Sequence, residues 1–230
     1  MTTAEVHHQH RDVSGGWLRP AVFGVTDGLV SNFALIAGVA GSHVAAHTVT
    51  LAGLAGLVGG AFSMATGEYI SVRSQNESMA AEIEVERREL RINPQAEADE
   101  LAQLFTERGV DAAIAGAVAE QISRDPELAL SVHAREELGV DPSSLPSPWT
   151  AATSSLLFFA VGAFIPLLPY LAGVTSIWTS AALALGALFV TGAVTSRFTA
   201  RPWWYAGARQ VLLGAAAALV TSLIGRAVGN

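Results

Sequence analysis

The stretch Asp27-Gly-Leu-Val-Ser-Asn-Phe-Ala-Leu-Ile-Ala-Gly-Val-Ala-Gly41 is apolar and rich in small residues, yet it begins with a carboxylate. Its composition predicts a membrane-spanning helix, and an ionisable group inside such a helix is costly and marks an ion pathway by default. Asp27 is therefore a candidate group on a transport route. If Asp27 instead caps a helix near the membrane surface, that argument weakens, because water can then solvate the carboxylate.

Four further apolar stretches resemble this one in length and composition. Of the 230 residues, 51% are hydrophobic and only 14% are charged, which favours one compact membrane unit over two soluble domains. Stretches near the roughly 20 residues needed to cross a bilayer cover residues 21–44, 48–72, 151–173, 174–196 and 206–228. We therefore predict an all-α membrane protein with five transmembrane helices.

The acidic residues are concentrated in one polar segment between the second and third spans. Of the 20 acidic residues, 16 lie between Arg73 and Ser147, against 7 arginines, which gives this segment a net charge of −9. We predict four parts: a polar N-terminal tail at 1–19, transmembrane helices one and two at 20–72, a small acidic helical metal-binding domain at 73–148, and transmembrane helices three to five at 149–230.

The arginines predict how the chain is oriented in the membrane. Arginines precede the first span, follow the second and crowd the turn between the last two, at Arg11, Arg19, Arg73, Arg197, Arg201 and Arg209. Under the positive-inside rule these regions are cytoplasmic. We expect the N-terminus and the acidic domain in the cytoplasm and the C-terminus outside, with Arg226 as the one dissenting charge. The chain lacks lysine, cysteine and signal-peptide features, and its composition is more typical of the bacterial plasma membrane than of a vacuole.

Glycines predict close helix packing in the first two spans. They recur at three- and four-residue spacings, at Gly38, Gly41, Gly53, Gly56, Gly59 and Gly60. Such spacings let membrane helices approach closely, although glycine is also common in transmembrane helices in general. We expect these two helices to contact each other or a second subunit.

Helix-capping and helix-breaking residues predict where the helices of the polar segment begin and end. The second span has no helix breaker after Gly67, so we expect it to continue to about Arg91 as one long helix. Helix starts are predicted at Asn93-Pro94, Asp111 and Asp125-Pro126, and a stop at Gly139 with Asp141-Pro142. The result is a layer of three or four helices. In the third span, Pro166 and Pro169 should interrupt the backbone hydrogen bonding.

The carboxylates of the polar segment fall on helix faces. Glu82, Glu86 and Glu89 are spaced i, i+4, i+7, and Glu97 with Glu100 are spaced i, i+3, so each set projects from one side of its helix. Like charges at these spacings repel. A solvated acidic face tolerates the repulsion, whereas a divalent cation would offset it, because carboxylate oxygens suit Mg²⁺, Ca²⁺, Mn²⁺ and Fe²⁺. The spacing alone leaves both interpretations open.

Four motifs together resemble the vacuolar iron transporter family. They are Asp27 to Gly41, Ser63-Met-Ala-Thr-Gly-Glu-Tyr69, Arg135-Glu-Glu-Leu-Gly139 and Gly162-Ala-Phe-Ile-Pro-Leu-Leu-Pro-Tyr170, and the resemblance extends from Leu18 to Val228. It implies a bacterial-type member with a cytoplasmic glutamate-rich domain. It also implies a homodimer of five-helix subunits that exports Fe²⁺ or similar metals such as Mn²⁺ from the cytoplasm in exchange for protons. The metal is then a substrate, and no tightly bound cofactor is expected.

The resemblance assigns candidate ligands residue by residue. Asp27 and Met64 match the family's membrane-pathway carboxylate and thioether. A second pathway carboxylate of some members falls at Gly56 and a pathway tyrosine at Phe159, so Glu68 is a candidate substitute further along the same helix. The glutamates that match the metal-binding domain are Glu86, Glu89, Glu97, Glu100 and Glu137, and we add Glu82 from the same face and Glu136 from the same motif.

Histidine replaces a family methionine at one position. A pair of methionines in some relatives falls at His133 and Ala134. Because imidazole binds Fe²⁺ and Zn²⁺ and titrates near neutral pH, His133 is a candidate ligand; a surface histidine on an amphipathic helix explains it as well. Two other sets of histidines can bind metal, but their positions are ordinary for exposed histidines. They are His7, His8 and His10 in the tail and His43 and His47 at the outer link.

The competing hypothesis is a membrane-anchored metal sensor or buffer without transport. It explains the glutamates but leaves Asp27 and Met64 without a role. A ferritin-type oxidase expects Glu-x-x-His pairs on bundle helices, and the predicted helices contain none. The chain has no Gly-x-Ser-x-Gly, phosphate loop or His-Glu-x-x-His, so we predict that it is not an enzyme. Its acidic balance opposes nucleic-acid binding.

Overall fold

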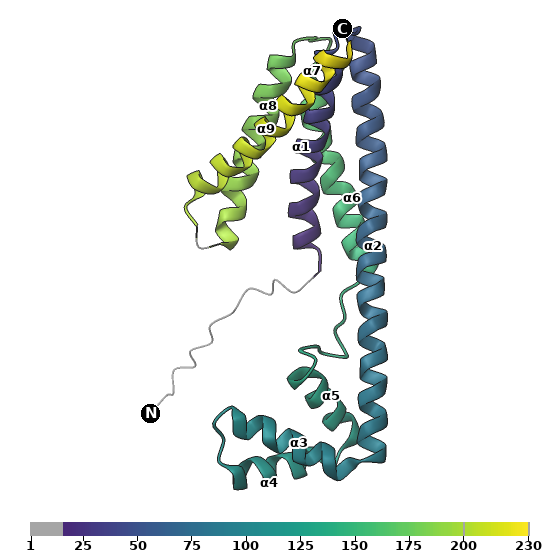
Figure 1. Ribbon diagram of the computed structural model, residues 1–230, viewed down its shortest axis with the longest axis vertical. Helices are drawn as coiled ribbons and strands as arrows, with labels where there is room; N and C mark the ends of the chain where they lie inside the picture. The colour runs from purple at the N-terminus through teal and green to yellow at the C-terminus, as the bar shows by residue number, and fades with distance from the viewer. Residues whose placement is uncertain (1–15, 200, 230) are drawn as a thin grey trace, which may run out of the picture. The chain divides into compact units, whose positions relative to one another are not determined.

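The computed structural model describes residues 16–199 and 201–229, and every regular element within them is helical (Figure 1). The predicted histidine cluster at His7, His8 and His10 lies outside these residues. In chain order the elements are α1 (Leu18–Gly41), α2 (Ala46–Ile92), α3 (Pro94–Glu107), α4 (Ala112–Ser123), α5 (Pro126–Glu136), α6 (Pro148–Phe164), the 3-10 turn η1 (Ile165–Leu167), α7 (Leu168–Leu171), α8 (Ile177–Thr195), the 3-10 turn η2 (Ser196–Phe198) and α9 (Trp203–Gly229).

Five helical stretches are long and apolar enough to cross a membrane. They are Leu18–Gly41, Ala46–Ile92, Pro148–Leu171, Ile177–Phe198 and Trp203–Gly229. This confirms the prediction of an all-α protein with five spans. The prediction of one long second helix is also confirmed, because α2 continues without interruption to Ile92.

The chain divides into two compact units. The first, which we call the membrane unit, comprises Met1–Ile70 and Ser147–Asn230; the second, which we call the polar unit, comprises Ser71–Pro146. The helix α2 contributes its first part to the membrane unit and its last part to the polar unit.

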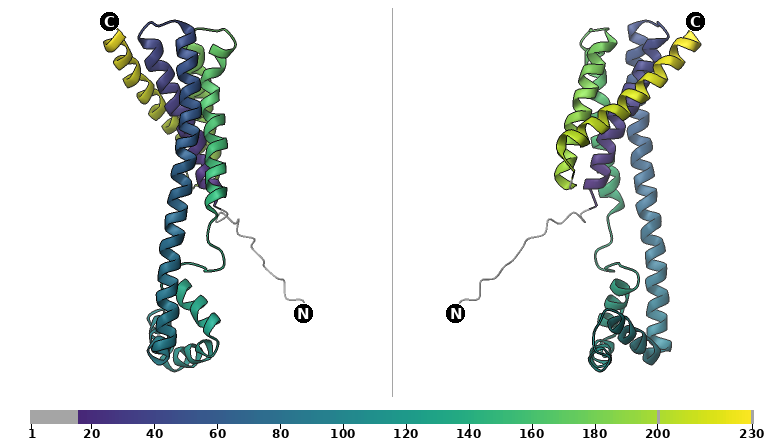
Figure 2. Two further views of the ribbon diagram at one scale, coloured as in Figure 1. Left: turned by 90° about the vertical axis from the view of Figure 1, so that its right-hand side faces the viewer. Right: turned by 60° about the vertical axis from the view of Figure 1, so that its left-hand side comes forward.

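The membrane unit is built around α1, which contacts α6, α8 and α9 (Figure 2). Glycines permit the closest of these approaches. A Cβ atom at Gly28 on α1 would overlap the carbonyl oxygen of Phe159 on α6, and one at Gly162 on α6 would overlap that of Val25 on α1. The backbones of α1 and α6 therefore touch directly, as small residues allow in membrane helices.

The third span is interrupted where its prolines predict. The α-helix α6 ends at Phe164, and η1 and α7 follow at Pro166 and Pro169. Two buried side chains from other helices bond to carbonyls here: Asn32 Nδ2 donates to Ala163 O at 2.6 Å, and Ser180 Oγ donates to Pro166 O at 2.7 Å. In a membrane-spanning helix, side chains of neighbouring helices satisfy the backbone groups that prolines free, because the bilayer core offers no water to do so.

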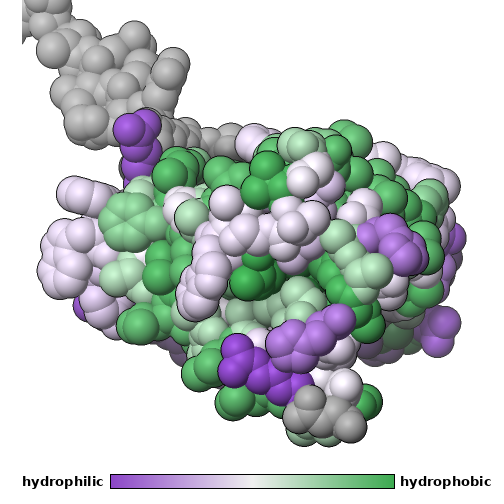
Figure 3. All heavy atoms as spheres, turned by 90° about the horizontal axis from the view of Figure 1, so that it is seen from above, coloured by the Kyte–Doolittle hydropathy of each residue, from purple (hydrophilic) through white to green (hydrophobic). Residues whose placement is uncertain are grey.

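The outer surface of the membrane unit is apolar. Figure 3, a view onto the end that carries the α1–α2 link, shows hydrophobic residues over much of the visible face. Large side chains on α8 and α9 are widely exposed, among them Trp178, Leu212 and Val228. Soluble proteins rarely expose contiguous apolar surfaces of this kind, so lipid or another subunit must cover this one.

The helices of the polar unit begin where the capping residues and prolines predict. Asp111 accepts hydrogen bonds from the backbone N–H groups of Ala113 and Ile114 at the start of α4, and Asp125 accepts two at the start of α5. Pro94 and Pro126 occupy the first turns of α3 and α5. Gly139, with a φ of 67°, turns the chain after α5. These contacts confirm the helix starts expected at Asp111 and Asp125.

Candidate metal centre

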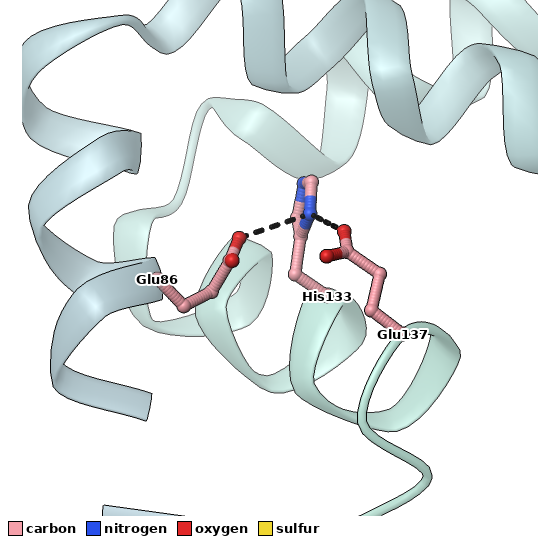
Figure 4. A group of neighbouring side chains, drawn as sticks. All are labelled: Glu86, His133 and Glu137. Atoms are coloured by element: carbon pink, nitrogen blue, oxygen red, sulfur yellow. Dashed lines mark hydrogen bonds and ion pairs between the residues drawn. The ribbon is translucent and has the colours of Figure 1, made fainter. Parts of the chain in front are cut away.

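Three carboxylates of the polar unit meet at one nitrogen of the His133 imidazole. Glu86 comes from α2, Glu97 from α3, His133 from α5, and Glu137 from the residue that follows α5. The Nδ1 atom of His133 lies 2.6 Å from Oε1 of Glu137, 3.1 Å from Oε1 of Glu86 and 3.8 Å from Oε2 of Glu97. Figure 4 shows Glu86 and Glu137 pointing toward the ring from opposite sides.

Local packing explains why these residues meet. Ile83 of α2 packs against Leu130 and Ala134 of α5, and this small apolar cluster holds the two helices together. Glu86 lies about one turn beyond Ile83, and His133 lies beside Ala134, so both point to the same edge of the cluster. Glu137 follows His133 by four residues, which places both on one helix face.

The third helix adds its carboxylate from its first turn. Glu97 lies in the first turn of α3, where the partial positive charge of the helix N-terminus favours an acidic side chain. It is 8% exposed, whereas His133 is fully buried. The side chains of Glu86 and Glu137 keep 14% and 24% of their surface exposed, so solvent still reaches the cluster from one side.

Two polar atoms of the cluster are buried without a hydrogen-bond partner among the described residues. They are Nε2 of His133 and Oε1 of Glu86, whose contact with Nδ1 of His133 at 3.1 Å is an ion-pair contact and not a hydrogen bond. Buried polar groups are normally paired, and a cluster of acids needs a counter-charge when it is withdrawn from water. The arrangement therefore leaves ligand capacity unused.

The electrostatics of the cluster are those of crowded carboxylates. Burial raises the pKa of the Glu86 carboxyl to about 7, and repulsion from Glu137 and Glu97 adds to the rise. Burial also raises the pKa of Glu97, where repulsion from Glu100 and Glu137 adds to it. The two carboxyls therefore lie close enough to disfavour each other's charge, and a divalent cation bound between them would offset this repulsion.

The spacing of the donor atoms suits a metal ion. Ligand atoms of Glu86, His133 and Glu137 all lie within 4.8 Å of one another. Bonds of about 2.0–2.2 Å from a transition metal to nitrogen or oxygen would leave its ligand atoms about 3–4 Å apart, so small side-chain movements would complete the site. Carboxylates with one imidazole are ligands that Fe²⁺, Mn²⁺ and Zn²⁺ accept.

The other glutamates predicted as ligands lie outside this cluster. Glu136 forms an ion pair with Arg108, and Glu89 accepts a hydrogen bond from Asn93 at 2.9 Å. Glu82 and Glu100 are exposed, although Glu100 lies close enough to Glu97 to raise its pKa. The interpretation of His133 as a surface histidine is wrong, because the side chain is fully buried.

The predicted pathway residues lie in the membrane unit, and one subunit does not gather them into a ligand set. Asp27 is exposed on α1. Met64 is half-buried on α2 and packs against the cluster formed by Ala61, Phe159 and Ala163, while Glu68 is half-buried further along α2. In the described part of the chain, neither Asp27 nor Glu68 takes part in an ion pair.

Sequence reasoning missed the ion pairs that brace the end of α5. Arg108, just after α3, pairs with Glu136, and Arg135 donates to Asp141 at 2.6 Å. The first joins two helices that are far apart in sequence, and no local spacing indicates it. The second spans six residues around Gly139, where a turn could have been expected to bring the two side chains together.

Comparison with known proteins agrees with the resemblance noted from the motifs. A sequence profile described as the VIT family matches residues 18–226. The chain is 31% identical to vacuolar iron transporter 1 of Oryza sativa subsp. japonica, over 96% of this chain and 90% of that protein. It is 40% identical to the vacuolar iron transporter of Acanthamoeba castellanii, over 79% of this chain and 71% of that protein. It is 30% identical to vacuolar iron transporter 1 of Arabidopsis thaliana, over 86% of this chain and 81% of that protein. The chain therefore belongs to the VIT family.

Proposed function

We propose that this protein is a membrane transporter of divalent transition-metal ions, with Fe²⁺ as its main substrate and Mn²⁺ as a second, and that it is not an enzyme. The observation that carries the proposal is the cluster of Glu86, Glu97, His133 and Glu137, whose donor atoms converge in a chain with five helices able to span a membrane. The names of the similar proteins, all iron transporters, support the choice of iron.

The proposed direction is export from the cytoplasm. Arginines outnumber acids at one end of the membrane unit, where Arg19 begins α1 and Arg197 and Arg201 join α8 to α9. The positive-inside rule favours a cytoplasmic location for this end, together with the N-terminus and the polar unit. The acidic cluster would then collect metal from the cytoplasm and supply it to Asp27, Met64 and Glu68, and the C-terminus would lie outside.

Exchange with protons follows from the chemistry of the ligands. A carboxylate must lose its proton to bind a metal ion, so metal and proton compete for the same oxygen. Protonation from the outer side would release the ion from Asp27 and complete an antiport cycle. The half-buried thioether of Met64 would favour transition metals over Mg²⁺ and Ca²⁺ on this route.

A homodimer would explain the exposure of Asp27. Phe23, Asp27, Ser31 and Leu35 recur every fourth residue on α1, and all four are exposed in the single subunit. A carboxylate that faces lipid is costly, whereas one that faces a second subunit or a water-filled cavity between subunits is common in transport proteins. We therefore propose that this stripe faces a second copy, so that the route carries two Asp27 side chains.

The membrane that houses the protein remains a prediction from composition. The similar proteins reported above are named vacuolar and come from plants and an amoeba. The absence of lysine and the abundance of alanine, glycine and arginine are our only grounds for a bacterial plasma membrane.

Flux measurements in proteoliposomes test the proposal. Fe²⁺, Mn²⁺, Zn²⁺ and Ca²⁺ are supplied in turn, each with and without a pH gradient, to the wild type, to Asp27→Ala and to the control Ser31→Ala on the same stripe. We expect Fe²⁺ and Mn²⁺ flux that a pH gradient drives and that Asp27→Ala abolishes. Wild-type flux in Asp27→Ala would remove Asp27 from the mechanism. Binding of Fe²⁺ without any flux would favour the sensor or buffer hypothesis, which the completeness of the cluster within the polar unit also supports.

A further inference from the structure

The last part of the chain has positive charge and no negative charge. After Asp141 the sequence contains no aspartate or glutamate, yet it contains four arginines, at Arg197, Arg201, Arg209 and Arg226. Three of these four lie at or near the connection between α8 and α9. These three, Arg197, Arg201 and Arg209, form what we call the arginine turn.

Among the described residues, no carboxylate pairs with the arginine turn. All three side chains belong to exposed residues, and none forms an ion pair in the part of the chain that the structure describes. Other exposed arginines of this protein, such as Arg87 and Arg124, do pair with glutamates, at 2.8 Å and 3.2 Å. The arginine turn therefore presents uncompensated guanidinium groups.

The fold fixes the depth of these groups. The spans Ile177–Phe198 and Trp203–Gly229 are joined by only residues 199–202, so the connection cannot extend far from the membrane surface. The turn η2, which carries Arg197, contacts both α8 and the start of α9. Arg209 lies fewer than two turns into α9, and a long arginine side chain reaches from there toward the interface.

Aromatic side chains mark the same depth. Trp203, Trp204 and Tyr205 open α9 and are each about half exposed. Phe189 of α8 packs edge-to-face on Trp203, with ring centroids 5.9 Å apart, and Trp204 packs in the same manner on Tyr205 at 6.1 Å. Tryptophan and tyrosine are enriched at the headgroup level of bilayers. The guanidinium groups and these rings therefore share the level at which lipid phosphates lie.

We propose that the arginine turn binds the headgroup of an anionic phospholipid. A guanidinium presents a planar fork of N–H donors that matches phosphate oxygens, and basic sites at the membrane surface attract anionic lipids. The bound headgroup supplies the negative charge that residues 142–230 lack and links the ends of α8 and α9. Nucleic acid and acidic proteins are disfavoured as ligands, because a connection this short stays at the level of the lipid phosphates.

The test compares lipids on the full-length protein purified in detergent. Phosphatidylglycerol or phosphatidylcholine is added, and bound lipid is counted by native mass spectrometry while thermal unfolding is recorded. The variant is R197Q/R201Q, and the matched control is R226Q, which removes one arginine at the other end of α9. Inorganic phosphate and glycerol 3-phosphate replace the lipid in parallel samples.

We expect the wild type to bind phosphatidylglycerol in preference to phosphatidylcholine and to unfold at a higher temperature with it. R197Q/R201Q should bind phosphatidylglycerol roughly thirtyfold more weakly, since each arginine near an anionic surface contributes a factor of about five, and R226Q should behave as the wild type. Equal binding of both lipids by the wild type would overturn the proposal even if the double variant fails to fold. So would equal losses in R226Q, or protection by soluble phosphate as strong as that by the lipid. None of these outcomes depends on metal transport.

Discussion

The imidazole Nδ1 of His133 on α5 lies 3.1 Å from a carboxylate oxygen of Glu86 on α2. The same nitrogen lies 2.6 Å from Glu137 and 3.8 Å from Glu97. Three carboxylates thus face one nitrogen at a largely buried position, and their mutual repulsion destabilises the metal-free protein. A divalent cation would turn these repulsions into ligand bonds.

Replacing His133 should weaken metal binding. In His133→Gln an amide stands in place of the imidazole, so a nitrogen ligand for the metal is lost while hydrogen-bonding groups remain in the cavity. We expect the affinity for Fe²⁺ to fall by about ten- to a hundredfold. Calorimetric titration of the purified full-length protein measures this, and His47→Gln, at an exposed position in the α1–α2 region, is the control. In addition, Co²⁺ bound to the wild type should show a nitrogen-ligand spectrum that His133→Gln lacks. An unchanged spectrum would rule out His133 as a ligand.

Glu137 and Glu136 are neighbours with different predicted roles. Glu137→Gln removes a charged ligand oxygen 2.6 Å from His133, so metal affinity should fall by about tenfold or more. Glu136→Gln breaks only the partly exposed ion pair with Arg108, which contributes about 1 kcal/mol or less to stability. Its metal affinity should stay within about twofold of the wild type. Equal losses of metal affinity in the two variants would show that metal binding depends on the overall acidic charge of the segment and not on the cluster.

Metal binding should strengthen as the pH rises through neutrality. The pKa of Glu86 in the folded protein is about 7, well above the ordinary value of 4.5, so a proton competes with the metal at physiological pH. In the metal-free protein, the folding stability changes with pH in the opposite direction. A raised folded-state pKa contributes stability that is fully present below about pH 4.5 and is lost as the pH rises through about 7. Glu86→Gln should flatten both dependences, as measured by calorimetry and by thermal unfolding across this range. A wild-type pH profile in this variant would contradict the assignment.

Asn32 should be needed for the stability of the broken third span. Its amide donates to Ala163 O at 2.6 Å in a buried position, so Asn32→Leu would leave that carbonyl without this donor. We expect the free energy of unfolding in detergent to fall by about 1–3 kcal/mol. Ser31→Ala, next to it, removes only a hydrogen bond within α1, from Ser31 Oγ to Asp27 O, and is the control that should have little effect. If the free energy of unfolding of Asn32→Leu equals that of the wild type, this hydrogen bond does not stabilise the third span.

The helices could be predicted from sequence because their signals are local. Asp111 and Asp125 cap the helices that they precede, and Pro166 interrupts the span in which it lies. Each of these effects depends on residues within one or two turns, so the printed sequence contains everything needed. The length of α2 was predicted in the same way, from the absence of a breaker between Gly67 and Asn93.

The cluster could be predicted only in part. Helical spacing indicates that Glu82, Glu86 and Glu89 share a face, but it does not say which of the three meets another helix. That choice depends on the packing of Ile83 against Leu130 and Ala134, a long-range contact, and it leaves Glu82 in solvent. The burial of His133 has the same cause. Asp27 is exposed in the single chain, and the second copy that we propose to face it is not something that the sequence of one chain describes.

Initial rates of Fe²⁺ flux at low Fe²⁺ concentration test the central claim most directly, because the claim joins the cluster of the polar unit to transport. Proteoliposomes containing the wild type, Glu137→Gln or Glu136→Gln are compared with protein-free vesicles. Wild type and Glu136→Gln should transport at equal rates, and Glu137→Gln should be slower by about tenfold, in line with its weaker binding. Wild-type vesicles that bind Fe²⁺ but accumulate it no faster than protein-free vesicles would contradict the claim that this protein is a transporter.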